Sequence, residues 1–372
     1  MSAQPGIVPA QLRALPWRVL FLVLTITGFG LIVLYSAAGG NIRPWAFGNG
    51  TKFAVYLVMA LVMSRMPVSF WKEIAWPGYL VILVLLVIVE LFGFVGGGSQ
   101  RWLDLGFIRL QPSELMKLTI VLAIAKFYDQ LPFGEIRGWN ALWPVGLAIF
   151  LPFALVLLQP DLGTGIMIAS GGLVVMFLAG APLRLFFGAA GAIAAALPVI
   201  WIAMHDYQRN RVLIFLNPES DPLGTGYHIT QSKIAIGSGG IFGKGFLQGS
   251  QSHLRYLPEP QTDFVFATLA EEWGLLGGLF LIGAFLMLFR WGMRVANRAP
   301  TRFGQLTAAG LTATIFFYVA INLSMVMGLA PVVGIPLPLV SHGGTAMLTV
   351  MLCVGILMGI EREGRVRRGR FD

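Results

Sequence analysis

Long apolar runs separated by short polar segments recur along almost the whole chain, and this pattern restricts the fold more than any other feature. About 20 consecutive apolar residues can cross the hydrocarbon core of a membrane as a helix. Only helices and closed barrels pair all their backbone groups in lipid, and runs of this length indicate helices. The apolar runs lie at residues 17–38, 53–66, 74–95, 113–127, 141–158, 166–181, 185–204, 264–289, 306–327 and 346–360. The sequence therefore predicts an all-α polytopic membrane protein with about ten transmembrane helices, organised as a single domain over residues 1–372.

Composition and charge support this class. Of the residues, 56% are hydrophobic and only 12% are charged, which is outside the range of a soluble domain. The net charge of +9 does not indicate nucleic-acid binding, because the Lys and Arg residues lie in short segments between the apolar runs. Lys and Arg are enriched on the cytoplasmic side of membrane proteins. Their distribution predicts that both termini are cytoplasmic, and that residues 205–262 form a long extracytoplasmic loop between helices 7 and 8.

The loop ends in RYLPEPQTDFVFATLAEEWG, residues 255–274, which brings Glu259, Asp263, Glu271 and Glu272 to the start of the eighth helix. Carboxylates are costly in hydrocarbon and persist mainly where they face a cavity, a partner or a reaction. Asp263 follows a proline-rich turn and precedes a long apolar run, so we expect it at the outer membrane boundary as a reacting group. The alternative is that Thr262 or Asp263 caps the first turn of the helix.

Polar motifs at the same predicted level supply further candidate site residues. In RWLDLGFIRLQPSELMK, residues 101–117, Glu114 and Lys117 are three apart and share a helix face. This intramembrane pair either fixes the packing of the helices or contacts substrate. The same motif contributes Arg101, Arg109 and Gln111 as candidate substrate-binding residues. In QPDLGTG, residues 159–165, Asp161 either caps the next helix or binds substrate.

Cations in the long loop and the last inter-helical segment complete the candidate site. Arg209, Arg211, Lys233 and Lys244 lie in or near the glycine-rich stretch at residues 224–245, and such an arrangement suits phosphate oxygens or forms a solvated face. The stretch GLAPVVGIPLPLVSHGGTAM, residues 328–347, is rich in proline and glycine. Non-helical backbone at membrane depth must be buried in protein or line a cavity, so we expect a re-entrant wall opposite Asp263, with Ser341 facing the substrate.

Four of these motifs, RWLDLGFIRLQPSELMK, QPDLGTG, PEPQTDFVFA and PLPLVSHGG, resemble in order and spacing those of the shape, elongation, division and sporulation (SEDS) family of bacterial cell-wall polymerases. Residues 206–277 are most similar to the members that act in cell elongation. The resemblance implies a peptidoglycan glycosyltransferase of the bacterial cytoplasmic membrane that polymerises lipid II. It also implies that Asp263 is the catalytic aspartate, active on the extracytoplasmic side, and that Glu114 and Lys117 form the family's intramembrane pair.

The resemblance carries further expectations about cofactors and partners. A divalent cation, Mg²⁺ or Mn²⁺, would stabilise the leaving pyrophosphate, and no organic cofactor is expected. A class B penicillin-binding protein would crosslink the strands within the elongation machinery, and we expect it to contact small residues of the ninth span (Ser324, Gly328, Gly310 and Ala313). Gln261 stands where the family usually has histidine, and His342 where it often has tyrosine. The alternatives to polymerisation are a lipid II flippase and a non-catalytic scaffold for a cell-wall synthase.

Overall fold

The computed structural model describes residues 16–368, except residues 97–98, 105–108, 205, 222–223, 255 and 258. The long helices are α2 (Trp17–Ala37), α3 (Gly48–Met63), α4 (Val68–Phe92), α5 (Pro112–Gln130), α6 (Trp139–Leu158), α7 (Leu162–Ala179), α8 (Leu183–Ala203), α12 (Val265–Arg298), α13 (Arg302–Val326) and α14 (Gly344–Arg368). A π-helical turn, Arg43–Phe47, precedes α3. Three short strands, β1 (Phe94–Gly96), β2 (Ser99–Asp104) and β3 (Arg109–Leu110), form an antiparallel sheet between α4 and α5.

Each predicted apolar run overlaps one of these helices over most of its length, so the all-α polytopic fold is confirmed. Among the described residues, eight helices are long and apolar enough to cross a membrane, and α5 and α8 are not among them. Helix α5 carries Glu114, Lys117, Lys126 and Asp129, which lower its hydropathy, and the apolar part of α8 is short. The count of ten spans therefore stays a prediction, although α5 lies inside the bundle.

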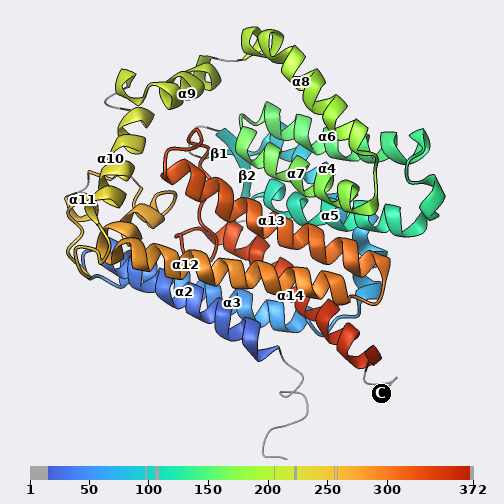
Figure 1. Cartoon of the computed structure of the whole chain (residues 1–372), viewed down its shortest axis with the longest axis horizontal. Helices are drawn as coiled ribbons and strands as arrows, with labels where there is room; N and C mark the ends of the chain where they lie inside the picture. The colour runs from blue at the N-terminus through green and yellow to red at the C-terminus, as the bar shows by residue number, and fades with distance from the viewer. Residues whose placement is uncertain are drawn as a thin grey trace, which may run out of the picture.

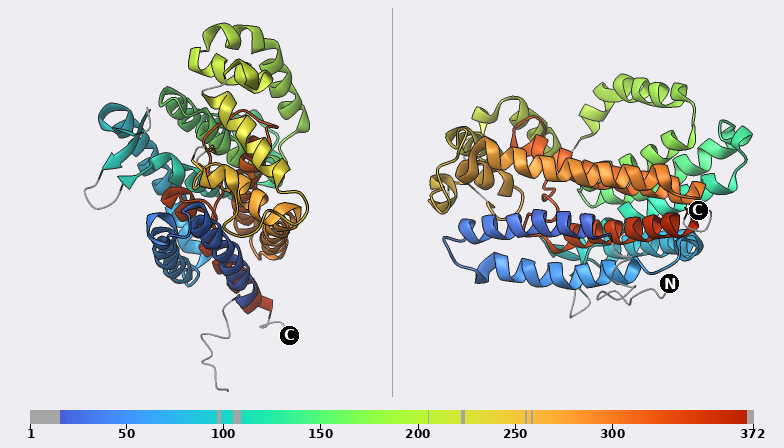
Figure 2. Two further views of the ribbon diagram at one scale, coloured as in Figure 1. Left: turned by 90° about the vertical axis from the view of Figure 1, so that its left-hand side faces the viewer. Right: turned by 60° about the horizontal axis from the view of Figure 1, so that its bottom comes forward.

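Helices α5, α7 and α13 form the centre of the bundle (Figure 1). They pack closely because Gly310 of α13 has no side chain at the contact: a Cβ there would lie 2.5 Å from Val175 of α7 and 2.7 Å from Val121 of α5. Small residues allow this close approach of helices in membranes. Helix α8 instead leaves the bundle and continues into α9 (Asp206–Leu216), so that the two stand out from it as an arm in both views of Figure 2.

Part of the segment predicted as a long extracytoplasmic loop, residues 205–262, is helical, and its position outside the membrane stays a prediction. It contains α9, α10 (Thr225–Ser238) and α11 (Ser250–His253), and α10 packs on the first part of α12. Buried Ser232 of α10 donates a hydrogen bond to the carbonyl of Val326 at the end of α13, at 2.7 Å. The sequence analysis did not predict α10, because its glycine and polar residues lower helix propensity. Packing of α10 on α12 and α13 stabilises it.

The glycine-rich segment after α10 pairs with a break in α12. At Gly274 the backbone leaves the helical region (φ 66°, ψ −162°). The Lys244 and Gly245 amides donate to the carbonyls of Glu271 and Glu272 at 2.9 and 3.0 Å, and the Leu275 amide donates to the Gly240 carbonyl at 2.9 Å. The break is therefore satisfied within the protein, as backbone at membrane depth must be.

These glycines allow a close approach of protein backbone, and the anion site predicted for this stretch stays a prediction. A Cβ at Gly243, where φ is +82°, would lie 2.1 Å from the Glu272 carbonyl oxygen. Lys244 forms a 2.6 Å ion pair with Glu271, whose side chain is fully buried. Glu272 accepts a hydrogen bond from Ser36 of α2 and lies 3.5 Å from His253. The carboxylates at residues 271 and 272 therefore serve to attach the segment at residues 239–253 to α12.

We expect Gly243→Ala to lower the melting temperature in detergent, because the new Cβ clashes with Glu272 and the backbone conformation is strained for a non-glycine residue. Strain of this kind costs about 1–3 kcal/mol. Gly237→Ala is the matched control, because a Cβ at Gly237 of α10 meets no atom within 4 Å. Differential scanning fluorimetry of both purified variants measures the difference, and equal melting temperatures would contradict the assignment.

Candidate active site

Asp263 lies in the turn between α11 and α12, immediately before the helix begins. The N-cap residue of α12 is Phe264, and no side chain caps this end of the helix. Thr262 instead directs its hydroxyl to the carboxylate of Glu259, at 3.2 Å. The alternative that Thr262 or Asp263 caps α12 is therefore wrong, and the Asp263 carboxylate is available for another role.

The surroundings of Asp263 change its acidity. Burial, and to a lesser extent the nearby negative charge of Glu259, together raise the pKa of the Asp263 carboxyl from an ordinary value of 3.8 to about 6. Desolvation and like charge both disfavour the ionised form. A pKa closer to neutrality makes this carboxylate a stronger base than an ordinary aspartate while leaving it ionised at pH 7 to 8.

The non-helical segment between α13 and α14, residues 327–343, covers the Asp263 turn. A Cβ at Gly334 (φ +70°) would lie 3.6 Å from the Asp263 carboxylate oxygen, so this glycine backbone faces the carboxylate. Ser341, 2% exposed, donates to the Thr262 carbonyl at 2.6 Å and accepts from the Leu337 amide at 2.8 Å. The segment predicted as a wall lies opposite Asp263, whereas its re-entrant position in the membrane stays a prediction; the hydroxyl of Ser341 bonds the wall to the turn.

The two positions that depart from the family pattern contact each other, with Gln261 in the Asp263 turn and His342 in the wall. The His342 amide donates to the Gln261 carbonyl at 2.7 Å. Burial lowers the pKa of the His342 imidazole, and the positive charge of Lys52 lowers it further. Lys52 lies beside the start of α14, where a Cβ at Gly344 would be 3.6 Å from its Nζ. Lys52 is therefore a cation beside the wall that the sequence analysis did not identify.

The predicted pairing of Glu114 with Lys117 is confirmed, and the pair belongs to a larger buried network. Lys117 Nζ lies 2.6 Å from Glu114 Oε1 and 2.7 Å from the Tyr318 hydroxyl, which also donates to Glu114. Thr349 of α14 donates to Glu114 Oε2 at 3.2 Å. The network joins α5, α13 and α14, and every one of its side chains is buried.

Arg101 and Asp161 fix the turn between α6 and α7. Asp161 accepts from the Thr164 amide at 3.1 Å, so it caps α7. Arg101 donates to the carbonyls of Gln159 and Pro160, at 3.3 and 2.6 Å, and lies 3.3 Å from the Asp161 carboxylate. The capping interpretation of Asp161 is confirmed. Both side chains have protein partners that explain their presence.

Among the side chains that the structure describes, the loop cations Arg209, Lys233 and Lys244 contact different parts of the protein. Arg209 donates to the carbonyls of Trp201 and Ile202 in α8, and Lys244 is paired with Glu271. Lys233 is exposed and extends over Gly328, where a Cβ would lie 2.8 Å from its Nζ. The backbone of α8 and the α12 break account for Arg209 and Lys244, and a role of these cations in binding an anion stays a prediction.

The remaining predicted residues are placed only in part. Gln111 is buried at the start of α5, where its carbonyl accepts from the Glu114 amide at 3.1 Å. Arg109 lies in β3 and Arg211 in α9, and their side chains are outside the described residues. Among the described residues, no group of three His, Cys, Asp or Glu side chains is placed to hold a metal ion. The Mg²⁺ or Mn²⁺ expectation stays a prediction, and no chemical step below depends on it.

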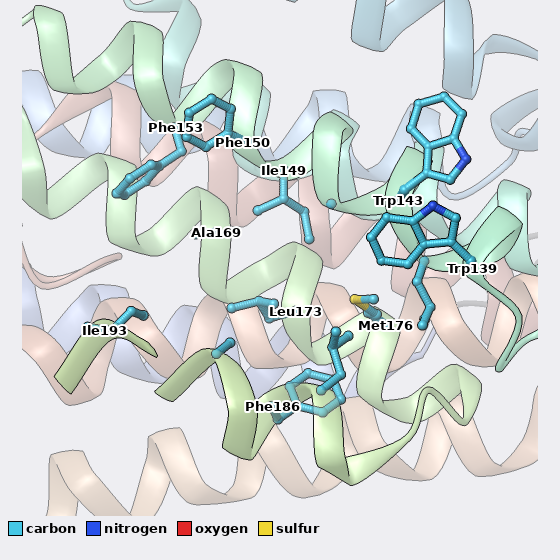
Figure 3. Close-up of a pocket in the computed structure, with 14 residues that line it drawn as sticks. Trp139, Trp143, Ile149, Phe150, Phe153, Ala169, Leu173, Met176, Phe186 and Ile193 are labelled. Atoms are coloured by element: carbon cyan, nitrogen blue, oxygen red, sulfur yellow. The ribbon is translucent and has the colours of Figure 1, made fainter. Parts of the chain in front are cut away.

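A groove of about 440 Å³ opens between α6, α7 and α8, separate from the Asp263 turn. Figure 3 shows aromatic side chains of α6 (Trp139, Trp143, Phe150) on one side and Phe186 and Ile193 of α8 on the other. Leu173 and Met176 of α7 line the region between them. The groove is apolar, and it contains none of the predicted site residues.

Comparison with known proteins identifies the family. The family model described as "Cell cycle protein", which groups FtsW, RodA and SpoVE, matches residues 17–366. The chain is 46% identical over 353 residues to the peptidoglycan glycosyltransferase MrdB of Escherichia coli (strain K12), covering 93% of each chain. The chain belongs to the SEDS family. It is also 32% identical to the peptidoglycan glycosyltransferase RodA of Treponema pallidum, covering 93% of this chain and 97% of that one.

Solved structures of SEDS proteins share the fold. A chain of a peptidoglycan synthase complex, solved in a study of how polymerization and crosslinking are coordinated, superposes with a TM-score of 0.83 at 30% identity and covers 94% of this chain and 98% of its own length. The rod shape determining protein RodA of Thermus thermophilus superposes with a TM-score of 0.71 at 28% identity, with coverages of 94% and 97%.

Sequence reasoning missed two polar residues of α13 that complete the site of this SEDS protein. Tyr318 joins the Glu114–Lys117 pair, and Asn322, four residues later on the same helix face, contacts the Asp263 turn. Both lie within an apolar span. Intramembrane polar residues are rare and usually functional, which was the signal that could have found them.

We expect Lys117→Met to destabilise the protein by about 3–5 kcal/mol, because Glu114 is left buried without its cation. The double variant Glu114→Leu/Lys117→Met removes both charges, so its stability should recover in large part. Thermal denaturation in detergent of Lys117→Met, Glu114→Leu and the double variant measures this coupling. If the double variant is stable but makes no polymer, the pair contacts substrate; recovery of both properties assigns it to packing alone.

Proposed function

We propose that this chain is a peptidoglycan glycosyltransferase that polymerises lipid II into glycan strands during cell elongation, with Asp263 as the general base. The observation that carries the proposal is the 46% identity to MrdB over 93% of each chain. A carboxylate of raised pKa at the end of a membrane-spanning helix supports the role of Asp263. Lipid II presents its sugars and pyrophosphate just outside the membrane, which is the level at which Asp263 would lie.

The proposed reaction joins two substrates by one displacement. The sugar 4-hydroxyl of the acceptor attacks the anomeric carbon of the donor, a C–O bond forms, and the bond from that carbon to the polyprenyl pyrophosphate breaks with its electron pair. Asp263 takes the hydroxyl proton as the bond forms. General base catalysis of this kind contributes about 10²–10⁴-fold. Because the Asp263 side chain is partly buried beside Gly334, the proton transfer takes place away from most of the solvent.

Cations are required to stabilise the leaving pyrophosphate. Arg101, Arg209 and Lys244 are engaged with protein partners. Lys52, beside the wall at residues 327–343, and Lys233, over Gly328, are the described cations that we propose for this role. Arg109 and Arg211 remain proposed substrate contacts, and a divalent cation would add to the same effect.

Asp263→Asn should abolish polymerisation of purified lipid II while leaving folding intact. The amide keeps the size of the side chain but cannot accept the hydroxyl proton. Gel analysis of the glycan product, with melting temperature as the folding control, tests this. Full activity of the folded Asn variant would remove Asp263 from the mechanism.

The rate at saturating lipid II should fall as pH drops through about 6, because Asp263 must be ionised to act.

The raised pKa of Asp263 also has a consequence for the stability of the protein. A carboxyl whose folded pKa is raised binds its proton more tightly in the folded state, so its ionisation costs stability once the pH exceeds 3.8, in full above about 6. Asp263→Asn removes that cost. Its melting temperature at pH 8 should therefore equal or exceed that of the wild type.

The flippase and scaffold alternatives predict different products. A flippase moves fluorescent lipid II across a vesicle membrane without joining the sugars, and a scaffold does neither. Proteoliposomes carrying lipid II, assayed for polymer and for translocation in the same preparation, separate the three. Polymer formation that requires Asp263 supports the glycosyltransferase, whereas translocation unaffected by Asp263→Asn, with no polymer, supports the flippase.

The protein is a multi-pass membrane protein, and we propose that it lies in the bacterial cytoplasmic membrane with both termini inside and Asp263 outside. We further propose a class B penicillin-binding protein of the elongation machinery as its partner. The similar chain in a peptidoglycan synthase complex supports this. The predicted contact residues need correction: Gly310 is buried against α5 and α7, and Lys233 covers Gly328. Ser324 and Ala313 remain candidates.

We expect the cognate penicillin-binding protein to co-purify in mild detergent and to raise the polymer yield. An Asp263→Asn chain should still form the complex, because Asp263 lies at the reaction and not on an outward helix face. Affinity purification followed by the lipid II assay measures both quantities. Absence of a complex, or equal yields with and without the partner, would contradict the partnership.

A further inference from the structure

Asn322 is a fully buried side chain of α13 that joins the Asp263 turn to the wall at residues 327–343. Its Nδ2 lies 2.9 Å from the carbonyl oxygen of Asp263 and 2.7 Å from that of Ile335. Both acceptors are carbonyls, so the amide must direct its NH₂ group toward them. One side chain thus uses its two donors to fix two segments that are far apart in the sequence.

Ser341 makes a second connection between the same two segments. Its hydroxyl donates to the Thr262 carbonyl at 2.6 Å, and the next residue in the wall, His342, donates its amide to the Gln261 carbonyl at 2.7 Å. On the other side of the wall, the Nδ2 of buried Asn49 donates to the Ser341 carbonyl at 3.3 Å. The carbonyls of residues 261, 262 and 263 are therefore all held by the wall or by α13.

The result of these bonds is the placement of the Asp263 carboxylate beside Gly334. The turn has no helix-capping bond of its own, and Asp263 stands just before Phe264, the N-cap residue of α12. Without the bonds from Asn322 and Ser341, the turn could move away from the wall and Asp263 would become exposed. Misplacement of a catalytic group by about 1 Å can cost about 10²-fold in rate.

We propose that Asn322 is a positioning residue, which holds Asp263 against the wall at residues 327–343 in the geometry that the reaction needs. The inference rests on the proposed function of Asp263 as the base. Asn322 touches only backbone carbonyls, so it acts through Asp263 and takes no part in bond making itself. Burial of the Asp263 carboxyl, which raises its pKa, depends on this placement.

The test compares Asn322→Leu, which removes both donors at similar volume, with Thr314→Val in the same helix. Thr314 is buried, and its hydroxyl donates to the Gly310 carbonyl within α13 at 3.0 Å, far from the wall. Steady-state polymerisation of lipid II by the full-length chain gives kcat and KM between pH 5 and 9. Hydrogen exchange of residues 259–265 gives a readout that needs no activity.

For Asn322→Leu we expect kcat to fall about tenfold to a hundredfold with KM nearly unchanged, because positioning and not binding is lost. The acid limb of the kcat profile should move below its wild-type position, because a more exposed Asp263 ionises more easily. Exchange at residues 259–265 should rise. Thr314→Val should leave all three unchanged. Ser341→Ala removes the other side-chain bond between the turn and the wall, so it should shift the acid limb in the same direction by less. This variant decides the question if Asn322→Leu does not fold.

An acid limb that stays in place in both variants, with rate losses no larger than the loss of folded protein, would overturn the positioning role. So would unchanged exchange at residues 259–265. The proposed function fails in a distinguishable way: a folded wild-type chain that makes no polymer contradicts the glycosyltransferase, while the exchange comparison still reports whether Asn322 holds the turn.

Discussion

Backbone that leaves the helical conformation inside or beside a membrane must have its polar groups paired by the protein, and this constraint organises the structure. It is met at three places. The break at Gly274 is paired by the glycine-rich segment at residues 240–245, and the turn at residues 261–263 is held by α13 and the wall. The turn between α6 and α7 is held by Arg101. The candidate active site lies where the turn at residues 261–263 meets the wall at residues 327–343.

The fold was largely predictable because membrane helices are long and apolar. All ten predicted runs lie in helices, and the wall opposite Asp263 followed from the prolines and glycines at residues 328–347. The region at residues 205–262 was not predictable in the same way. Helix α10 contains glycine, serine and threonine, and its stability comes from packing on α12 and from the bond between Ser232 and Val326. Contacts of that kind are absent from local sequence pattern.

The charged residues of the candidate site were predictable from the sequence, but the residues that they contact were not. Asp263 and the Glu114–Lys117 pair were evident because carboxylates and ammonium groups are rare in spans. The sequence did not assign a role to the loop cations, since a cation beside glycine suits phosphate and backbone carbonyls equally well. Lys244 bonds Glu271, and Arg209 bonds the carbonyls of α8. Which of these partners a long side chain reaches depends on the fold, and sequence spacing does not specify it.

The buried Glu114–Lys117 pair is costly in isolation, and its connection to α13 gives it a structural reason to be there. A buried ion pair contributes little net stability, but it can specify how elements pack. The Tyr318 hydroxyl accepts a hydrogen bond from Lys117 and donates one to Glu114. Asn322 lies one turn further along the same face of α13. Any rotation or shift of α13 that broke the bonds of Tyr318 would also displace the donors that hold Asp263. The register of α13 against α5 and the position of the Asp263 carboxylate are therefore set by the same helix face.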